Sequence, residues 1–300
     1  MPITEILSRN AALYGDKVSL VEINPELQEK HEVSWQEYEL IETNPAASFR
    51  RQMTWCEFDA TANRFANLLL GRGIKKGDKV AILLMNCLEW LPIYFGILKA
   101  GAVAVPLNFR YDAEEIKYCL ELAEVVALVF GPEFVDRIEV IYEKVPQVKT
   151  HFYVGENGLA FAENYSQLER SYSEKEPEIE LAADDDAAIY FSSGTTGFPK
   201  AILHTHNSLL SSCYTEQQHH QQTTQDTFLC IPPLYHTGAK MHWFGSFLVG
   251  GKAVLLRGVK PSWILKAVSE EQATIVWLLV PWALDILNAL ESGELSLDNY

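Results

Sequence analysis

From residue 80 onward, short runs of apolar and β-branched residues alternate with segments whose apolar residues recur at helical spacing. The first unit is a strand over 80–84 followed by a helix over 89–100, which Gly101 ends. The same pattern predicts further strands over 102–106, 125–130, 187–191, 227–231, 253–256 and 274–279. It predicts further helices over 133–144, 207–217, 241–249, 262–271 and 282–290, and one that Asp112 caps and that runs through Glu121. Strands that are apolar on both faces and joined by helices indicate an α/β fold with parallel-sheet βαβ layers, covered by helices on both sides.

The alternation is interrupted over residues 155–186, which are polar and rich in acidic side chains. Residues 173–177 and 184–186 carry five of its ten acidic side chains. Such a stretch is typical of a surface excursion rather than of a buried element. It is also a candidate boundary at which a new lobe or layer begins.

Composition and charge exclude some classes of protein. Hydrophobic residues make up 48% of the 300 residues and charged residues 21%, which excludes wholesale disorder. Lysine and arginine number 24 against 40 aspartate and glutamate, so the formal net charge is −16. A chain this acidic attracts phosphate backbones and anionic lipids only weakly, and we expect no nucleic-acid partner.

The cysteines and the apolar runs predict a cytoplasmic protein. The five cysteines are widely spaced and include no C-x-x-C pair, so neither a disulfide framework nor a zinc site is indicated. The first ten residues do not resemble a secretory signal. The longest stretch without Asp, Glu, Lys or Arg, residues 201–215, has 15 residues and is too short and polar for a membrane span.

The loop that follows the strand over 187–191 has the composition of a phosphate site. Residues 192–200, Ser-Ser-Gly-Thr-Thr-Gly-Phe-Pro-Lys, combine two glycines, four hydroxyls and one lysine. Glycines let backbone N–H groups converge on an anion, hydroxyls add donors, and Lys200 brings a positive charge. Neither a Walker motif nor a G-x-G-x-x-G motif is present. A plain surface turn is the alternative, but seven such positions match by chance on the order of once in a hundred million windows.

This loop resembles that of the AMP-forming adenylating superfamily, which comprises acyl- and aryl-CoA synthetases, firefly-type luciferases and the adenylation domains of peptide synthetases. Residues 98–106, Leu-Lys-Ala-Gly-Ala-Val-Ala-Val-Pro, are similar to a structural segment of that family, and residues 232–238, Pro-Pro-Leu-Tyr-His-Thr-Gly, to its substrate-side motif. The similarity runs from about Thr54 to the end of the chain. It implies ATP, Mg²⁺ and CoA as cosubstrates or cofactors. The phosphate-binding residues that it implies are Ser192, Ser193, Gly194, Thr195, Thr196, Gly197 and Lys200, and the substrate-binding residues are His236, Thr237 and Gly238.

The resemblance covers only the N-terminal part of that family. Ala201 stands where many members have glycine after the lysine, a small change that we expect to be tolerated. The family's adenine and magnesium segment, its ribose aspartate and its C-terminal lobe with the catalytic lysine are not found before Tyr300. We therefore expect an incomplete AMP-binding domain over residues 1–300, with approximate sub-lobes 50–215 and 1–49 plus 216–300. The catalytic residues are expected beyond Tyr300, and the 300-residue chain alone is expected to be inactive.

Histidines and aromatic residues outside the loop bear on metal binding and on the substrate. The pairs His204 with His206 and His219 with His220 show no third ligand at fixed spacing, so no metal site is predicted from them. The segment 234–248 offers Tyr, Trp, Phe and Met, with Lys240 as its one cation. It favours an apolar acid, fatty or aromatic, as substrate.

The leading hypothesis is therefore the N-terminal part of an acyl-CoA synthetase, which activates a carboxylic acid to acyl-AMP and then to acyl-CoA. Two alternatives stay open. One is a non-catalytic module that binds a nucleotide or an acyl group, and the other is a fragment of an amino-acid adenylation domain.

Overall fold

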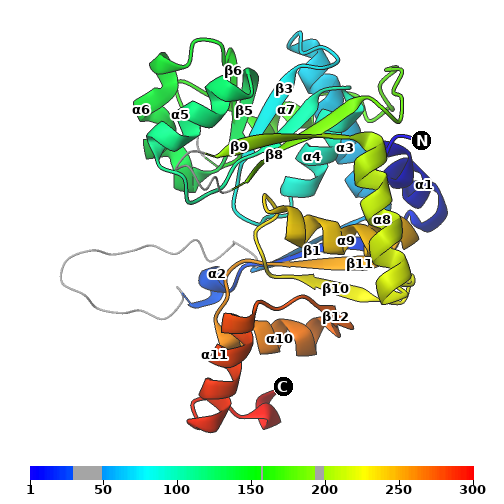
Figure 1. Cartoon of the computed structure of the whole chain (residues 1–300), viewed down its shortest axis with the longest axis vertical. Helices are drawn as coiled ribbons and strands as arrows, with labels where there is room; N and C mark the ends of the chain where they lie inside the picture. Colours follow the sequence, from blue (N-terminus) through cyan, green and yellow to red (C-terminus); the bar gives the residue numbers. More distant parts are fainter. Residues whose placement is uncertain (30–48, 157, 193–198) are drawn as a thin grey trace.

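The computed structural model describes residues 1–29, 49–156, 158–192 and 199–300. Two β-sheets lie one above the other with helices between them and on their outer faces (Figure 1). This arrangement is the α/β fold with parallel strands that the alternating pattern predicts. None of the described helices is long and apolar enough to cross a membrane.

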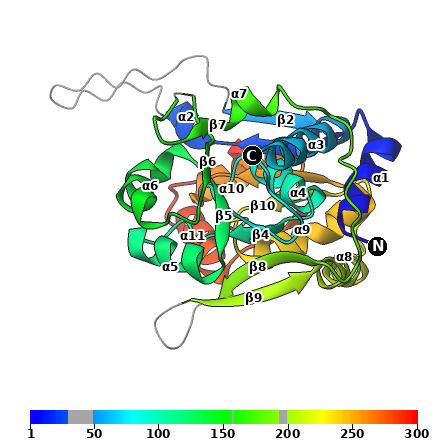
Figure 2. The same ribbon diagram turned by 90° about the horizontal axis from the view of Figure 1, so that it is seen from above.

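The larger sheet has seven strands in the order β7-β6-β5-β3-β4-β8-β9. Its strands are β3 (Lys79–Leu83), β4 (Val103–Pro106), β5 (Val125–Phe130), β6 (Thr150–Tyr153), β7 (Glu163–Asn164), β8 (Asp186–Ser192) and β9 (Lys200–Thr205). All neighbouring strands are parallel except β8 and β9, which form an antiparallel pair at one edge (Figure 2).

The smaller sheet has five strands in the order β12-β10-β11-β1-β2. Its strands are β1 (Val18–Ile23), β2 (Arg50–Thr54), β10 (Thr227–Cys230), β11 (Lys252–Leu256) and β12 (Ile275–Val276). The parallel part comes from the C-terminal half of the chain and from β1, while β2 pairs antiparallel with β1. The N-terminal and C-terminal segments therefore build this sheet together.

Helices connect the strands and cover the sheets. The α-helices are α1 (Thr4–Tyr14), α2 (Pro25–Glu29), α3 (Trp55–Gly71), α4 (Trp90–Lys99), α5 (Ala113–Leu122), α6 (Val135–Ile141), α7 (Tyr165–Glu169), α8 (His206–His220), α9 (Thr237–Val249), α10 (Pro261–Glu271) and α11 (Val280–Glu291). Short 3-10 turns lie at Pro132–Phe134, Tyr142–Lys144 and Leu297–Asn299. The predicted cap Asp112 accepts the backbone N–H of Glu115 and forms a capping box with it at the start of α5.

Each sheet separates two groups of buried apolar side chains, one on each of its faces. Along β3, Val80 and Ile82 point into the central core with α3, α4 and α9, whereas Ala81 and Leu83 pack with α5 and α6 on the outer face. The smaller sheet shows the same division, and its outer face packs against α10. Side chains alternate across a strand, so strands that are apolar at every position require cover on both sides. The continuous apolar runs of the sequence have this cause.

The structure contains elements that the sequence pattern does not predict. The stretch 155–186 holds β7 and α7, and β6 precedes it. β9 lies where the end of a loop was expected. The sequence does not predict this strand because its residues are mostly exposed at the sheet edge and show no alternation of buried and exposed positions. β12 pairs with β10 at two positions only, so the strand predicted over 274–279 is too long.

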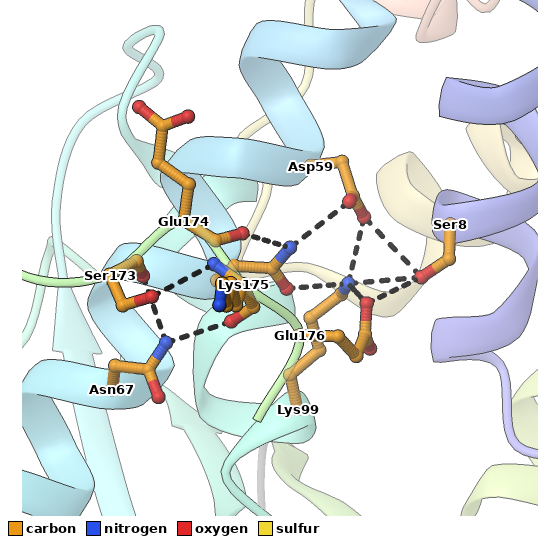
Figure 3. A network of polar contacts seen from close by, with 9 residues as sticks. Ser8, Asp59, Asn67, Lys99, Ser173, Glu174, Lys175 and Glu176 are labelled. Carbon is orange, nitrogen blue, oxygen red and sulfur yellow. Dashed lines mark hydrogen bonds and ion pairs between the residues drawn. The ribbon is translucent and has the colours of Figure 1, made fainter. Parts of the chain in front are cut away.

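A buried lysine fixes part of the acidic stretch 155–186 to the helices. Lys99, at the end of α4, is 1% exposed, and its Nζ lies within hydrogen-bond distance of four oxygens on α1, α3 and the segment before β8 (Figure 3). These are Ser8 Oγ at 3.0 Å, Asp59 Oδ1 at 2.7 Å, Asn63 Oδ1 at 2.8 Å and Glu176 Oε2 at 2.6 Å. Asn67 adds bonds to the carbonyl oxygens of Ser173 and Lys175 at 2.8 and 2.9 Å. The predicted surface excursion is thus anchored over three helices.

Ion pairs join the smaller sheet to the start of helix α4. Glu22 on β1 is 4% exposed, accepts the backbone N–H of Leu88 at 2.9 Å and pairs with Arg51 of β2. Arg51 also pairs with Glu89 at 2.6 Å, next to the start of α4. Burial raises the pKa of Glu22, and the Arg51 guanidinium opposes that rise. The start of α4 is therefore fixed to β1 and β2.

Candidate functional site

Strand ends from both sheets meet on one side of the molecule. Asn86 follows β3, and the turn over 232–236 follows β10. Asn86 Nδ2 donates to the carbonyl oxygen of Pro232 at 3.0 Å, and its Oδ1 accepts the backbone N–H of Leu234 at 2.9 Å. The ring of Phe109, beyond β4, packs edge-on against Tyr235 with centroids 5.3 Å apart. Ligands of open α/β sheets bind outside the carboxyl ends of the strands, so this meeting point is the candidate site.

The loop that the sequence predicts to bind phosphate connects β8 to β9, and its described ends, Ser192 and Lys200, lie at this same end. Ser192, the last residue of β8, is paired in register with Lys200, the first residue of β9. Ser192 is half-buried, Lys200 is exposed and Pro199 is buried. The base of the loop is thus a β-pair that places a hydroxyl and an ammonium opposite each other. The remaining predicted phosphate residues lie outside the described residues, namely Ser193, Gly194, Thr195, Thr196 and Gly197.

His236 caps helix α9. Its Nδ1 accepts the backbone N–H of Gly238 at 3.1 Å, which satisfies one of the free donors at the helix start. A nitrogen that accepts this bond carries no proton, so the neutral ring holds its proton on Nε2. The ring is exposed, and Nε2 is therefore a hydrogen-bond donor outside the helix. The three predicted substrate residues, His236, Thr237 and Gly238, form one turn, of which Thr237 and Gly238 are half-buried.

The glycine in this turn permits a close contact. A Cβ atom at Gly238 would lie 3.1 Å from Cη2 of Trp277 and 3.2 Å from Nδ1 of His236. Trp277 follows β12 and packs against the central core. Any larger residue at position 238 would push Trp277 or the His236 ring away, so the turn depends on this glycine.

Asn86 is a positioning residue that the sequence analysis missed. It is 6% exposed, and both ends of its amide are used on the turn over 232–234. Its position in the sequence offers one indication of this role. Asn86 is a polar residue shortly after an apolar strand, and such positions lie at the edge where parallel strands end. Its partner lies 146 residues away in the sequence. No local pattern predicts that pairing.

Lys240 lies one turn into α9 and is completely buried. Its Nζ is 4.7 Å from the ring centroid of Trp90, 4.1 Å from that of Tyr94 and 4.4 Å from that of Tyr190. Among the residues that the structure describes, Nζ has no hydrogen-bond partner. Burial lowers the pKa of Lys240 well below its usual range, while the ring faces favour the charged form.

The rings around Lys240 link it to β8, the strand that ends at Ser192. The Tyr94 and Tyr190 hydroxyls lie 3.0 Å apart, and Tyr190 precedes Ser192 by two residues on β8. Burial raises the pKa of both phenols.

His204 packs edge-on against Tyr190, and burial lowers the pKa of His204. His206 is buried at the start of α8, where burial lowers its pKa to about 4.

Comparisons with known proteins show the family of this chain. The family described as AMP-binding enzyme matches residues 9–298. The long-chain-fatty-acid–CoA ligase FadD13 of Mycobacterium tuberculosis is 32% identical over 223 residues, which are 74% of this chain and 41% of that protein. The medium-chain fatty-acid–CoA ligase of Escherichia coli is 32% identical over 249 residues, which are 80% of this chain and 44% of that protein. The chain thus spans less than half the length of these curated relatives.

Solved structures share the fold. The inhibitor-bound N-terminal domain of FACL13 from Mycobacterium tuberculosis superposes with a TM-score of 0.80 at 25% identity, covering all of this chain and 68% of that one. A long-chain-fatty-acid–CoA ligase from Archaeoglobus fulgidus gives a TM-score of 0.83 at 20% identity, covering 97% of this chain and 54% of that one. With the family match over nearly its whole length, the chain belongs to the AMP-binding enzyme family.

Proposed function

We propose that the protein containing this chain is an AMP-forming acid–CoA ligase. In the first step a carboxylate oxygen attacks the α-phosphorus of ATP, and pyrophosphate leaves with the electrons of the broken P–O bond. In the second step the thiolate of CoA attacks the acyl carbonyl, and AMP leaves. The observation that carries the proposal is that the β8–β9 loop and the His236 turn belong to strand ends joined by Asn86 and by the Lys240 ring contacts.

Each segment of the site has a proposed role. The loop that begins at Ser192 and ends before Lys200 would hold the ATP phosphates, with the Lys200 ammonium balancing their charge. The His236 Nε2–H would donate to an oxygen of the acid and orient its carboxylate. Mg²⁺ would enter with ATP and neutralise phosphate charge. Neither residues 192–200 nor residues 232–238 contain a carboxylate, so we assign no metal ligand there.

We propose an apolar acid as substrate. In the structure, the support for this proposal comes from the lack of an exposed cation in the turn rather than from the aromatic side chains of α9. Trp243, Phe244 and Phe247 lie in the central core with at most 1% exposure, so they brace α9 rather than face a ligand. Lys240, the one cation of the segment 234–248, is equally buried. The turn therefore presents no exposed lysine or arginine to a second anionic group. The relatives named for medium- and long-chain fatty acids support the same substrate class.

Cytoplasmic location is also proposed. All five cysteines are free thiols, of which Cys119, Cys213 and Cys230 are buried. Free thiols of this kind are typical of a reducing compartment.

The test is ATP–pyrophosphate exchange with the protein expressed from the whole coding sequence, with the 300-residue chain in parallel. Fatty, aryl, dicarboxylic and amino acids are supplied one at a time, and thioester is measured after CoA is added. Lys200→Ala should reduce exchange by roughly 10- to 150-fold, because a charge-assisted contact is worth about 1.5 to 3 kcal/mol. Lys149→Ala is the control, since Lys149 is an exposed lysine before β6, at the opposite ends of the parallel strands.

The outcomes separate the alternatives. Exchange with fatty or aryl acids that Lys200→Ala lowers and Lys149→Ala leaves unchanged supports the proposal. A clear preference for amino acids would instead indicate an amino-acid adenylation domain. Binding of ATP without exchange for any acid would indicate a non-catalytic module, and exchange within twofold of wild type in Lys200→Ala would refute the role of Lys200.

A further inference from the structure

A carboxylate and two imidazoles meet between α8 and α9, and none of the three belongs to the His236 turn. Glu216 and His220 lie four residues apart on α8, and Glu216 Oε2 is 3.2 Å from His220 Nε2. Across the helix interface, the same Glu216 oxygen is 2.9 Å from His242 Nδ1 on α9. One potential ligand atom from each residue lies within 4.8 Å of the others. Among the residues that the structure describes, no other trio of His, Cys, Asp or Glu is grouped in this way.

The trio is held by the packing of its two helices. Gln222, just after α8, donates through Nε2 to the carbonyl oxygen of His242 at 3.4 Å. The ring of Trp277 lies against the His242 ring with centroids 4.8 Å apart, which limits how that imidazole can rotate. Glu216 is 17% exposed and His242 27%, whereas His220 is 48% exposed and reaches from the solvent side. Two of the three groups are therefore preset, and the third can adjust.

We propose that Glu216, His220 and His242 bind a divalent transition metal ion, with Zn²⁺ as the best fit. Zn²⁺ prefers imidazole nitrogen and carboxylate oxygen at about 2.0–2.2 Å in a tetrahedron, whose ligand atoms then stand about 3.3 Å apart. The separations of 3.2 and 2.9 Å from Glu216 are close to that spacing. Three protein ligands leave a fourth position for water. The hard ions Mg²⁺ and Ca²⁺ prefer oxygen ligands and fit this set poorly.

Binding requires a defined change in proton positions. Without the metal, each imidazole donates an N–H to Glu216, so the protons lie on His220 Nε2 and His242 Nδ1. With the metal, those two nitrogens bind the ion and each neutral ring carries its proton on the other nitrogen. The carboxylate exchanges two hydrogen bonds for one metal bond. The formal charge of −16 on the chain favours a cation at this surface.

Trp277 gives the site a spectroscopic reporter. It contacts His242 on one side, and it is the residue that a Cβ at Gly238 would meet on the other. A metal on His242 therefore lies close to one specific indole, and a paramagnetic ion such as Cu²⁺ should quench its emission. Trp277 also places the proposed metal next to the His236 turn, although binding itself does not depend on the proposed ligase activity.

The experiment titrates the metal-free 300-residue chain with ZnCl2 by calorimetry and with CoCl2 by visible absorption. We expect one ion per chain, a tetrahedral Co²⁺ spectrum and a higher melting temperature with Zn²⁺. His242→Gln and Glu216→Gln should each weaken Zn²⁺ binding at least tenfold. His219→Asn is the matched control, because His219 is the exposed neighbour of His220 and is outside the trio.

Fluorescence supplies the second measurement. Cu²⁺ should quench wild-type emission more than that of Trp277→Phe, and His242→Gln should show the same reduced quenching. Circular dichroism without metal confirms that each variant is folded, and no ATP or acid is present at any stage. The proposal is overturned if wild type binds no Zn²⁺ at 100 times the chain concentration. It is equally overturned if folded His242→Gln or Glu216→Gln binds Zn²⁺ as tightly as His219→Asn does.

Discussion

Two lysines in neighbouring helices are equally buried, yet their surroundings are opposite. Lys99, on α4, is 1% exposed and has four oxygen acceptors within 3.0 Å. Lys240, on α9, is 0% exposed and faces three aromatic rings, with no hydrogen-bond acceptor among the described residues. Helix α4 contributes to the surroundings of both lysines. It carries Lys99 at its C-terminal end, and Trp90 and Tyr94, two of the rings that face Lys240, nearer its N-terminal end.

This difference means that the buried charge of Lys99 stabilises the fold, whereas burying Lys240 costs free energy of folding. A buried charge is stable when carboxylates and hydrogen bonds compensate for lost water, and Lys99 has both. Lys240 has only ring faces, which attract an ammonium but do not accept strong hydrogen bonds from it. We infer that Lys99 stabilises the fold by joining α1, α3 and the segment before β8 (Figure 3). Lys240, by contrast, lowers stability at the core of the candidate site.

Replacing Lys99 should have the largest effect. Lys99→Met removes the ammonium from the partly buried Asp59 carboxylate, which keeps only the neutral donors Asn63 Nδ2 and Ser8 Oγ. It also leaves the Asn63 carbonyl oxygen without its Lys99 donor. Breaking a buried pair costs about 3 to 5 kcal/mol, and we expect the lower end because Glu176 is half-exposed. Urea unfolding of the 300-residue chain measures the loss. Lys175→Met, an exposed lysine in the same segment, should change stability by less than about 0.5 kcal/mol. A loss below about 1 kcal/mol in Lys99→Met would contradict the inferred role.

Lys240→Met should act in the opposite direction. Methionine fills a similar volume without a charge, and replacing a poorly compensated buried charge with an apolar group is neutral or stabilising. We expect a gain of about 1 kcal/mol at pH 7 in urea unfolding. A loss of more than about 2 kcal/mol would show that the rings of Trp90, Tyr94 and Tyr190 hold the charged ammonium favourably.

The pH dependence tests the cause of that gain. Burial lowers the pKa of Lys240 in the folded chain, whereas the unfolded lysine keeps a pKa near 10.5. Between these two values the unfolded state binds the additional proton, so raising the pH stabilises the folded wild type relative to Lys240→Met. The advantage of the variant should shrink from pH 7 toward pH 10, by at most about 1.4 kcal/mol per pH unit. Parallel stability curves would mean that the pKa of Lys240 is not lowered.

The sequence predicts the fold well where burial is two-sided. The strands β3, β4, β5, β8, β10 and β11 were all predicted within one or two residues, because continuous apolar runs leave few alternatives. The edges were predicted poorly. β9 is exposed, β12 is very short, and the antiparallel direction of β2 and β9 depends on pairings that no local pattern contains.

The candidate site divides in the same way. The loop at Ser192–Lys200 and the turn at His236 are contiguous motifs, so a resemblance identifies them, and the structure places Ser192 opposite Lys200. Asn86 and Trp277 act through partners far away in the sequence and could not be predicted. His220 and His242 are 22 residues apart on two helices, so only their packing brings them to Glu216. Lys99 and Lys240 are indistinguishable by sequence, since each lies in an apolar helix.

The smallest expected effect concerns the exposed member of the Lys99 cluster. Glu176 is 52% exposed, so water and salt screen its pairing with Lys99, and such pairs are worth about 0 to 1 kcal/mol. Glu176→Gln should therefore cost about 0.5 kcal/mol in urea unfolding, and the loss should diminish in 0.5 M NaCl. Asn67 still binds the carbonyl oxygens of Ser173 and Lys175, so the segment should stay as resistant to limited proteolysis as in wild type. A loss above about 2 kcal/mol would mean that Glu176, rather than the buried Asp59, is the main partner of Lys99.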